Sequence, residues 1–135
     1  MIPSSDFFRL TAVETSRDQR GWVSNLLDFL PLPAEALRNV HLVEMQPGSV
    51  RGNHVHKKQR EWIILCGGPL RVVVTVGDDR FETVLAGDAP MMLHIEPGAA
   101  HAVRNEGAAR AFLVAITDQL YDFENPDVQR VRLLD

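Results

Sequence analysis

The sequence contains one cysteine, no excess of basic residues and no long apolar run, and each absence excludes a class of protein. Because Cys66 is alone, the chain cannot form an internal disulfide, and its place in an apolar run predicts a buried strand thiol rather than a reactive one. The 14 basic residues are outnumbered by 18 acidic residues, which gives a formal net charge of −4. Binding to nucleic acid through neutralised phosphates is therefore not expected.

The sequence also lacks the features that direct a protein into or across a membrane. No apolar run approaches the roughly 18 residues that a spanning helix needs, and residues 1–6 have neither the basic nor the apolar region of a secretory signal. We therefore expect a cytoplasmic protein with no membrane partner. Its length of 135 residues predicts a single domain, residues 1–135, with a substantial core.

Short runs rich in Val, Ile, Leu and Phe recur between turn residues such as Gly, Pro, Asn and Asp, and they are typical of strands. The expected strands are residues 9–15, 22–27, 40–45, 61–66, 70–76, 81–85, 91–95, 101–104 and 110–117. Only residues 28–38 have the composition of a short helix, with a proline suited to its first turn. The pattern predicts an all-β protein built as a double-sheet sandwich or barrel.

Two histidines and a glutamate follow one another at a spacing that is typical of a metal site. His54 and His56 are two residues apart, so on an extended strand they share a face, and the strand that opens at Glu61 can bring a carboxylate beside them. His101, in a later strand, supplies a fourth ligand. Three neutral imidazoles and one carboxylate suit zinc, iron, nickel or manganese and leave positions open for water or substrate. The alternative is a cluster that hydrogen-bonds within the barrel without metal.

The same residues resemble the first cupin motif at every position. The motif residues are Gly48, His54, His56, Glu61 and Gly68, separated by five, one, four and six residues. The end of the second motif is matched by Pro97, Gly98, His101 and Asn105, although Glu96 stands where a proline is usual. This resemblance implies a cupin jelly roll, a double-stranded β-helix, with a core of about residues 38–118 and edge strands at both ends. Asn105 is expected to hydrogen-bond in a turn or behind the ligands.

Three segments resemble the sugar-nucleotide branch of the cupins, which is related to dTDP-4-dehydrorhamnose 3,5-epimerase. Residues 18–22 are similar to the Asp-x-Arg-Gly-aromatic start of those enzymes. Residues 47–57 are similar to the core of the dTDP-sugar 3,4-ketoisomerases and to the C-terminal cupin domain of capsular-polysaccharide enzymes that act on UDP-sugars; residues 121–127 are similar to the end of that domain. The ketoisomerases typically have glutamine where Glu61 stands and work without metal, whereas the capsular domain keeps the carboxylate and is associated with zinc. Glu61 thus favours a metal-bearing site, with zinc preferred.

The resemblance implies an isomerase or epimerase that acts on a 4-keto-6-deoxy sugar nucleotide. The bound ion is expected to polarise the C4 carbonyl, with an uncoordinated histidine or water as the base. If the site is metal-free, His56 becomes the base instead. Tyr121 is a candidate acid for the enolate, or a residue that packs the tail against the domain.

Three further residues are candidates for substrate binding. Arg51 has the bidentate fork that can clamp a pyrophosphate, or it is an exposed hairpin charge. Lys57 matches the lysine of the ketoisomerases, or it faces solvent in a turn. Trp62 can form the apolar wall of a pocket, or it belongs to the core.

Two other functional classes and one assembly are compatible with these residues. The first class is a metal-dependent dioxygenase or another small-molecule cupin enzyme, because the same ligands on iron serve oxygen chemistry. The second is a non-catalytic cupin that binds a small ligand. A homodimer is expected, because residues 7–13 and 128–133 have the pattern of edge strands with apolar side chains to cover.

Overall fold

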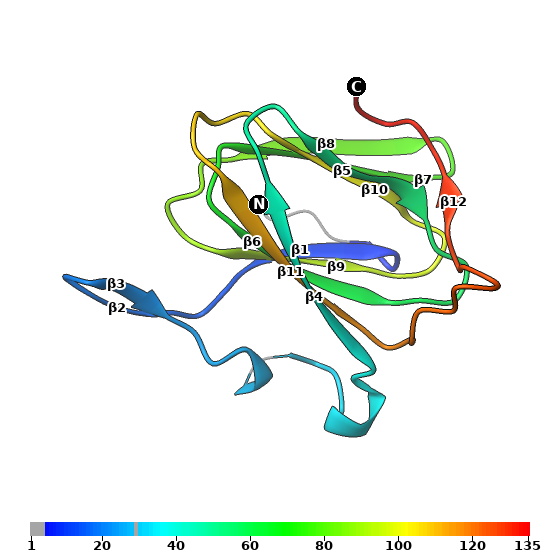
Figure 1. Ribbon diagram of the computed structural model, residues 1–135, viewed down its shortest axis with the longest axis horizontal. Coiled ribbons are helices and arrows are strands. Elements are labelled where there is room, and N and C mark those ends of the chain that lie inside the picture. The colour runs from blue at the N-terminus through cyan, green and yellow to red at the C-terminus, as the bar shows by residue number, and fades with distance from the viewer. Residues whose placement is uncertain (1–4, 29) are drawn as a thin grey trace.

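A computed structural model describes residues 5–28 and 30–135 of the chain. Within these residues the strands form two five-stranded antiparallel sheets and a separate two-stranded hairpin (Figure 1). The first sheet has the order β1 (Phe8–Ala12), β9 (Met91–Ile95), β6 (Glu61–Cys66), β11 (Ala111–Thr117) and β4 (Asn39–Met45). The second has the order β12 (Gln129–Arg130), β5 (Val50–Val55), β10 (Ala100–Asn105), β7 (Leu70–Val76) and β8 (Asp79–Leu85). The predicted all-β cupin jelly roll is confirmed.

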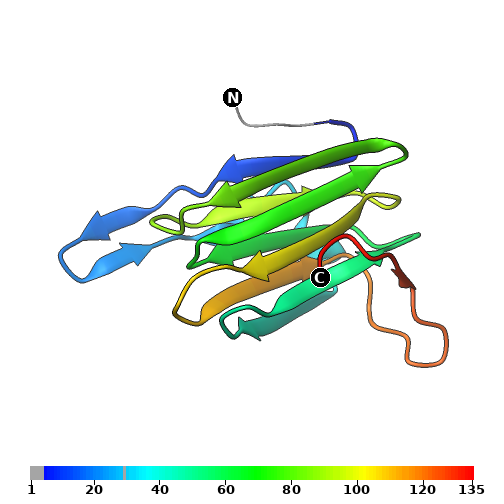
Figure 2. The same ribbon diagram turned by 90° about the horizontal axis from the view of Figure 1, so that it is seen from above.

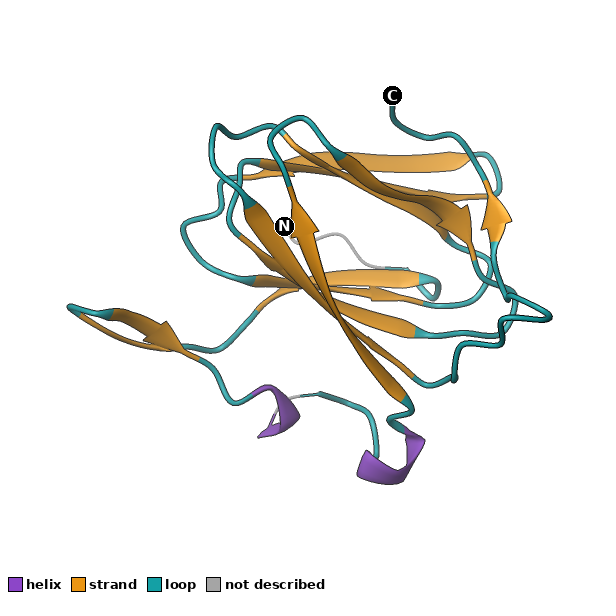
Figure 3. Ribbon diagram, viewed as in Figure 1, coloured by secondary structure: helices purple, strands orange, loops and turns teal. Residues whose placement is uncertain are grey.

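The hairpin of β2 (Ser16–Asp18) and β3 (Gly21–Val23) projects from the two sheets, as Figures 1 and 2 both show. Helical structure in the described residues is limited to two single 3₁₀ turns, η1 (Leu26–Asp28) and η2 (Ala34–Ala36) (Figure 3). The predicted strand 22–27 is therefore shorter than expected, and the predicted helix 28–38 is reduced to one turn that follows Pro33. No helix in the described ranges is long and apolar enough to cross a membrane.

The space between the two sheets holds the main apolar core. Side chains alternate along each strand, so the inward-facing residues of both sheets meet. Those that are at most 2% exposed include Met45, Leu65, Leu70, Val72, Val74, Leu93, Ile95 and Val103. Burying this much apolar surface is the dominant favourable term in folding.

Each outer face is covered in part by a terminal segment of the chain. On the first sheet, Val13 and Leu30 of the N-terminal segment pack on Trp62 and Ile64 of β6. Both faces of β6 are thus buried, which explains its unbroken apolar sequence after Glu61. On the second sheet, Leu134 of the C-terminal tail packs on Val73 and Ala102.

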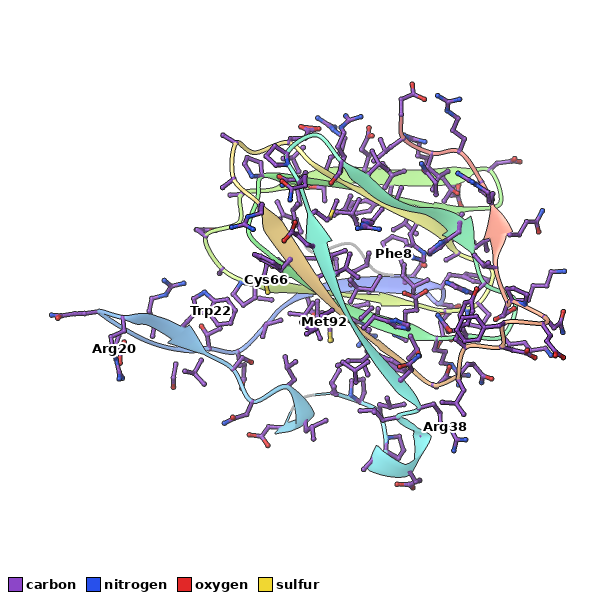
Figure 4. All side chains as sticks on the ribbon, viewed as in Figure 1. Phe8, Arg20, Trp22, Arg38, Cys66 and Met92 are labelled. Atoms are coloured by element: carbon purple, nitrogen blue, oxygen red, sulfur yellow. The ribbon has the colours of Figure 1, made fainter. Side chains whose placement is uncertain are left out.

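Cys66 lies at the end of β6 and is only partly buried, not fully buried as predicted. It packs against the apolar cluster that contains Met92, and both residues are labelled in Figure 4. Burial raises the pKa of its thiol, which disfavours the nucleophilic thiolate.

Candidate metal centre and adjoining cavity

Three strands bring the candidate ligands together from both sheets. His54 on β5 pairs directly with His101 on β10 in the second sheet. Glu61 is the first residue of β6 in the opposite sheet. Because β6 alternates, Glu61 and Ile63 line the space between the sheets while Trp62 points away from it. One carboxylate therefore faces two imidazoles across the barrel.

Among the described residues, His54, Glu61 and His101 form a compact set of metal-binding atoms that all lie within 4.8 Å of one another. The Nε2 atoms of His54 and His101 are 3.2 Å apart, and Nε2 of His101 is 3.9 Å from Oε1 of Glu61. Ligands at about 2.1 Å from a tetrahedral zinc ion lie about 3.4 Å from one another. The two distances that involve His101, 3.2 and 3.9 Å, lie on either side of this value, so the set is compact enough to close around a zinc-sized ion with small shifts of the side chains.

The protonation of this set also suits a divalent cation. Burial, aided by the neighbouring His101 and His56, lowers the pKa of His54 to about 4. Burial likewise lowers the pKa of His101. Burial alone would raise the pKa of Glu61, but the hydrogen bond from His56 and the facing imidazoles outweigh it and lower that pKa to about 2. Two neutral imidazoles and an ionised carboxylate are the forms in which these side chains bind metal.

His56, the fourth predicted ligand, lies beside this compact set. Its Nε2 is 2.5 Å from Oε1 of Glu61, and its Nδ1 is 2.6 Å from the backbone oxygen of Asp127. Both partners are acceptors, so both ring nitrogens donate and the imidazole is protonated. Burial lowers the pKa of His56, but its interactions with Glu61 and Asp127 outweigh burial and raise it. In this structure His56 is thus an ion-pair partner of Glu61.

The cluster lies in the wall of a cavity of about 510 Å³ between the sheets. This volume is in the range of small-molecule sites. Apolar side chains also line this cavity, among them Val43, Ile63, Val103 and Leu113. A second cavity of about 580 Å³ adjoins it and shares four of its residues, namely His56, Gln59, Tyr121 and Val128. His54, Glu61 and His101 line only the cavity between the sheets, whereas His56 lines both cavities.

The other predicted site residues differ in how close they lie to this cavity. Arg51 lines it, and its guanidinium donates a hydrogen bond to the backbone oxygen of Glu44. Tyr121 is half exposed and lines both cavities. Lys57 is exposed and lines neither. Trp62 does not reach the cavity, because its buried ring stacks on His94 on the outer side of the first sheet.

Asp127 is a site residue for which sequence reasoning proposed no role. Its carboxylate accepts hydrogen bonds from the backbone N–H groups of Lys57, Lys58 and Gln59, while its own carbonyl holds His56. It therefore fixes the turn that joins β5 to β6. Gln59 was also missed, and its side-chain amide donates to Oε1 of Glu61.

A cupin jelly roll with a His/Glu cluster facing a cavity is the class that this geometry defines. Residues 16–129 match the family of the polysaccharide biosynthesis C-terminal domain, and the chain belongs to this family. No curated protein sequence matches it.

Solved structures with the same fold include sugar-nucleotide enzymes. The dTDP sugar isomerase from Desulfovibrio desulfuricans G20 superposes with a TM-score of 0.78 at 17% identity, over 94% of this chain and 85% of that one. The 3,4-ketoisomerase QdtA from Thermoanaerobacterium thermosaccharolyticum, solved with TDP, gives 0.70 at 18% identity over 93% and 88%. The capsular polysaccharide assembling protein CapF from Staphylococcus aureus gives 0.67 at 21% identity, over 90% of this chain. The chain spans about a third of the length of CapF. At these identities the likeness concerns the fold.

Proposed function

We propose that the protein is a metal-bearing isomerase or epimerase that acts on a 4-keto-6-deoxy sugar nucleotide. The observation that carries the proposal is the compact set of His54, Glu61 and His101 in the wall of a cavity large enough for a sugar. The adjoining cavity offers room for the nucleotide part of the substrate. QdtA, which shares the fold, was also solved with TDP-4-keto-6-deoxyglucose.

The chemistry requires a base near C3 and positive charge near the C4 oxygen. The C4 ketone acidifies the hydrogen on C3, and the charge of the resulting enolate develops on the C4 oxygen. His54, Glu61 and His101 would hold a divalent ion, with zinc preferred over iron, nickel or manganese. When bound, that ion supplies Lewis-acid polarisation of the carbonyl.

His56 is the candidate base because it lines both cavities and lies outside the compact ligand set. The interaction with Glu61 is a main reason that the pKa of His56 is raised. A bound ion would share the charge of Glu61 and weaken this effect. A His56 ring that has lost its Nε2 proton to solvent would then accept the C3 proton at that nitrogen. Nδ1 keeps its own proton throughout and donates it in a hydrogen bond to the backbone carbonyl of Asp127.

Two residues of the cavity walls are proposed to contact the substrate. Tyr121 lies where the cavities join and is the candidate acid for the enolate. Arg51, in the wall of the inner cavity, is the candidate contact for the diphosphate. Lys57 and Trp62 receive no role, because neither lines these cavities.

Solvent deuterium exchange tests the proposal directly. Any 3-epimerase or 3,4-ketoisomerase must first remove the C3 proton, so zinc-loaded protein in D₂O should place deuterium at C3 of a dTDP- or UDP-linked 4-keto-6-deoxy sugar. The measurement is the loss of the C3 proton signal by NMR. Absence of exchange with both nucleotides would contradict the proposal, and iron-dependent oxygen uptake by the same protein would favour the dioxygenase hypothesis.

Glu61→Gln separates catalysis with the ion from catalysis by histidine alone. The amide keeps the size of the side chain but removes its charge, so metal content and exchange rate should fall together if the ion polarises the carbonyl. Exchange at the wild-type rate in metal-free Glu61→Gln protein would assign the chemistry to His56 alone. Elemental analysis of protein purified without added metal gives the occupancy.

We also propose that the protein is a homodimer. Leu42 is 84% exposed on β4, an edge strand, and Phe112 on the neighbouring β11 is 50% exposed. Apolar side chains beside an unpaired edge are commonly covered by a second chain. Sedimentation equilibrium at micromolar concentration should give twice the 15.1 kDa mass of the chain, and Leu42→Asp should shift the protein to the monomer.

A further inference from the structure

Strand β5 contains an irregularity immediately before His54. His54 pairs with His101 and Gly52 pairs with Ala102, so Asn53 is an extra residue that has no partner in β10. Gly52 and Asn53 both have positive φ, 91° and 54°. A β-bulge of this kind bends the strand and re-aims the side chains that follow it. His54 is the first side chain after the bulge.

Gly52 allows this close approach of β5 to β10. A Cβ atom at this position would lie 2.6 Å from the backbone oxygen of His101, which is too close for any other residue. Asn53 tolerates its left-handed conformation because its short polar side chain can bond locally. Glycine explains how the bulge fits, but glycine cannot hold it in one conformation.

The C-terminal tail supplies the bonds that hold Asn53. Its side-chain oxygen accepts hydrogen bonds from the N–H groups of Leu133 and Leu134, at 2.9 and 3.1 Å, and its side-chain nitrogen donates to the carbonyl of Leu134 at 2.9 Å. Its backbone oxygen accepts a further bond from Val131 at 2.9 Å. Leu134 is itself buried against Ala102, the residue of β10 opposite Gly52. The tail thus contacts both strands at the bulge.

We propose that Asn53 and the C-terminal residues 131–134 are a positioning element of the metal centre, which they serve by fixing the register of β5. The inference rests on the metal-bearing site of the proposed function. Side chains alternate along a strand, so loss of the bulge would shift the pairing by one residue. Asn53 would then lie opposite His101, and His54 would turn to the outer face, away from Glu61. The element contacts no substrate and acts through the direction of His54.

Two matched pairs of variants test this role. Asn53→Gly keeps the backbone free to adopt positive φ but removes the three side-chain bonds. Its control is Asn105→Gly, which also removes three side-chain bonds, to Met45, Ala109 and Gly107, at the other end of β10. Leu134→Ala loosens the tail without altering β5. Its control is Leu30→Ala, because Leu30 is equally buried, 8% exposed, on the outer side of the first sheet.

The primary measurement is zinc affinity, by competition with a chromophoric chelator, in protein shown to be folded by circular dichroism. Asn53→Gly and Leu134→Ala should each weaken zinc binding by about 10- to 100-fold, the usual effect of residues that orient metal ligands. The double variant should be no weaker than the stronger single variant, because both changes release the same bulge. The two controls should lower the melting temperature and leave zinc affinity unchanged.

Wild-type zinc affinity in Asn53→Gly and Leu134→Ala would overturn the inference, as would an equal loss in all four variants. If the wild-type protein binds no zinc, the metal-bearing part of the proposed function fails, and the register is measured in metal-free protein instead. Changed ring ¹⁵N shifts of His54 in the first member of each pair, but not in the controls, would then support the positioning role. Unchanged shifts in all variants would overturn it.

Discussion

The two ends of the space between the sheets are built from the same strands but are filled differently. Along β6 the inward residues run from Glu61 through Ile63 to Leu65, so one strand carries both the ionised carboxylate of the cluster and a core leucine that is 2% exposed. β10 repeats this arrangement, from His101 to Val103. At the core end the side chains are close-packed, whereas at the cluster end they border a cavity of about 510 Å³.

Because of this difference, we expect the apolar end of the barrel to determine stability and the cluster end to determine the chemistry. Burying an ionised carboxylate costs free energy unless it is paired and hydrogen-bonded. Glu61 is paired with His56 and accepts a bond from Gln59, which offsets the cost without adding much stability. The apolar end has no buried charge, so no such cost opposes the stabilisation that its burial provides. Substitutions at the cluster end should therefore change metal binding, and substitutions at the apolar end should change unfolding.

The largest expected effect tests the cluster end. His101→Ala removes one of the three proposed ligands, so zinc affinity should fall by about 1,000-fold, or about 4 kcal/mol. Because the apolar end is untouched, urea denaturation of the metal-free protein should give a free energy of unfolding within about 1 kcal/mol of the wild-type value.

The control for His101→Ala is His41→Ala, which also removes an imidazole from the cavity wall, from a residue outside the compact set. Zinc affinity should be retained in this variant. Equal loss of zinc in both variants would show that the cavity wall as a whole, and not the three proposed ligands, determines metal binding.

The next largest effect tests the apolar end on the same strand as Glu61. Leu65→Ala leaves a cavity in the packed core, so it should lower the free energy of unfolding by about 3 kcal/mol. The remaining folded protein should bind zinc with wild-type affinity. A large loss of zinc affinity in folded Leu65→Ala protein would mean that the two ends are coupled through β6. Metal binding would then not be separate from the packing of the apolar end.

The apolar end was also the part that sequence reasoning predicted best. The bounds of β6, β7 and β9 coincide with the runs 61–66, 70–76 and 91–95, because packing between two sheets selects continuous β-branched and aliphatic residues. The convergence of His54, Glu61 and His101 was predicted as well, from the strand spacing of the first two and from the resemblance of the segment around His101 to the second cupin motif. That same period, with Glu61 inside, puts Trp62 outside, so the position of Trp62 relative to the cavity was available from the sequence.

The contacts of His56 were not available from the sequence. They join residues 71 positions apart, His56 and Asp127, through a backbone carbonyl whose direction no side-chain pattern encodes. The bulge at Asn53 escaped prediction for a similar reason, since its four bonds run to residues 131–134, which are far from it in the sequence. Local propensity indicates strands, whereas irregular backbone depends on tertiary contacts.

Asp127 lies at the cluster end but should contribute to stability, by less than Leu65 does. Its carboxylate accepts three backbone N–H bonds in the turn before β6. Burial would raise its pKa, but these bonds outweigh burial and lower it. Asp127→Ala should lower the free energy of unfolding at pH 7 by about 1 to 2 kcal/mol, as for a lost helix cap. Asp127→Asn, which can still accept one or two of the bonds, should lose less.

The sign of the pH dependence follows from the lowered pKa of Asp127. A carboxylate whose pKa is lower in the folded state stabilises that state fully above the unfolded value, about 3.9, and this contribution is lost as the pH falls through the folded value. The difference in stability between wild type and Asp127→Ala should therefore be constant from pH 7 to about pH 5 and shrink steadily in more acidic buffer. Urea denaturation curves across this range measure it. A difference that persists unchanged in the most acidic buffer would show that Asp127 stabilises the turn by packing and that the charge of its carboxylate contributes no stability.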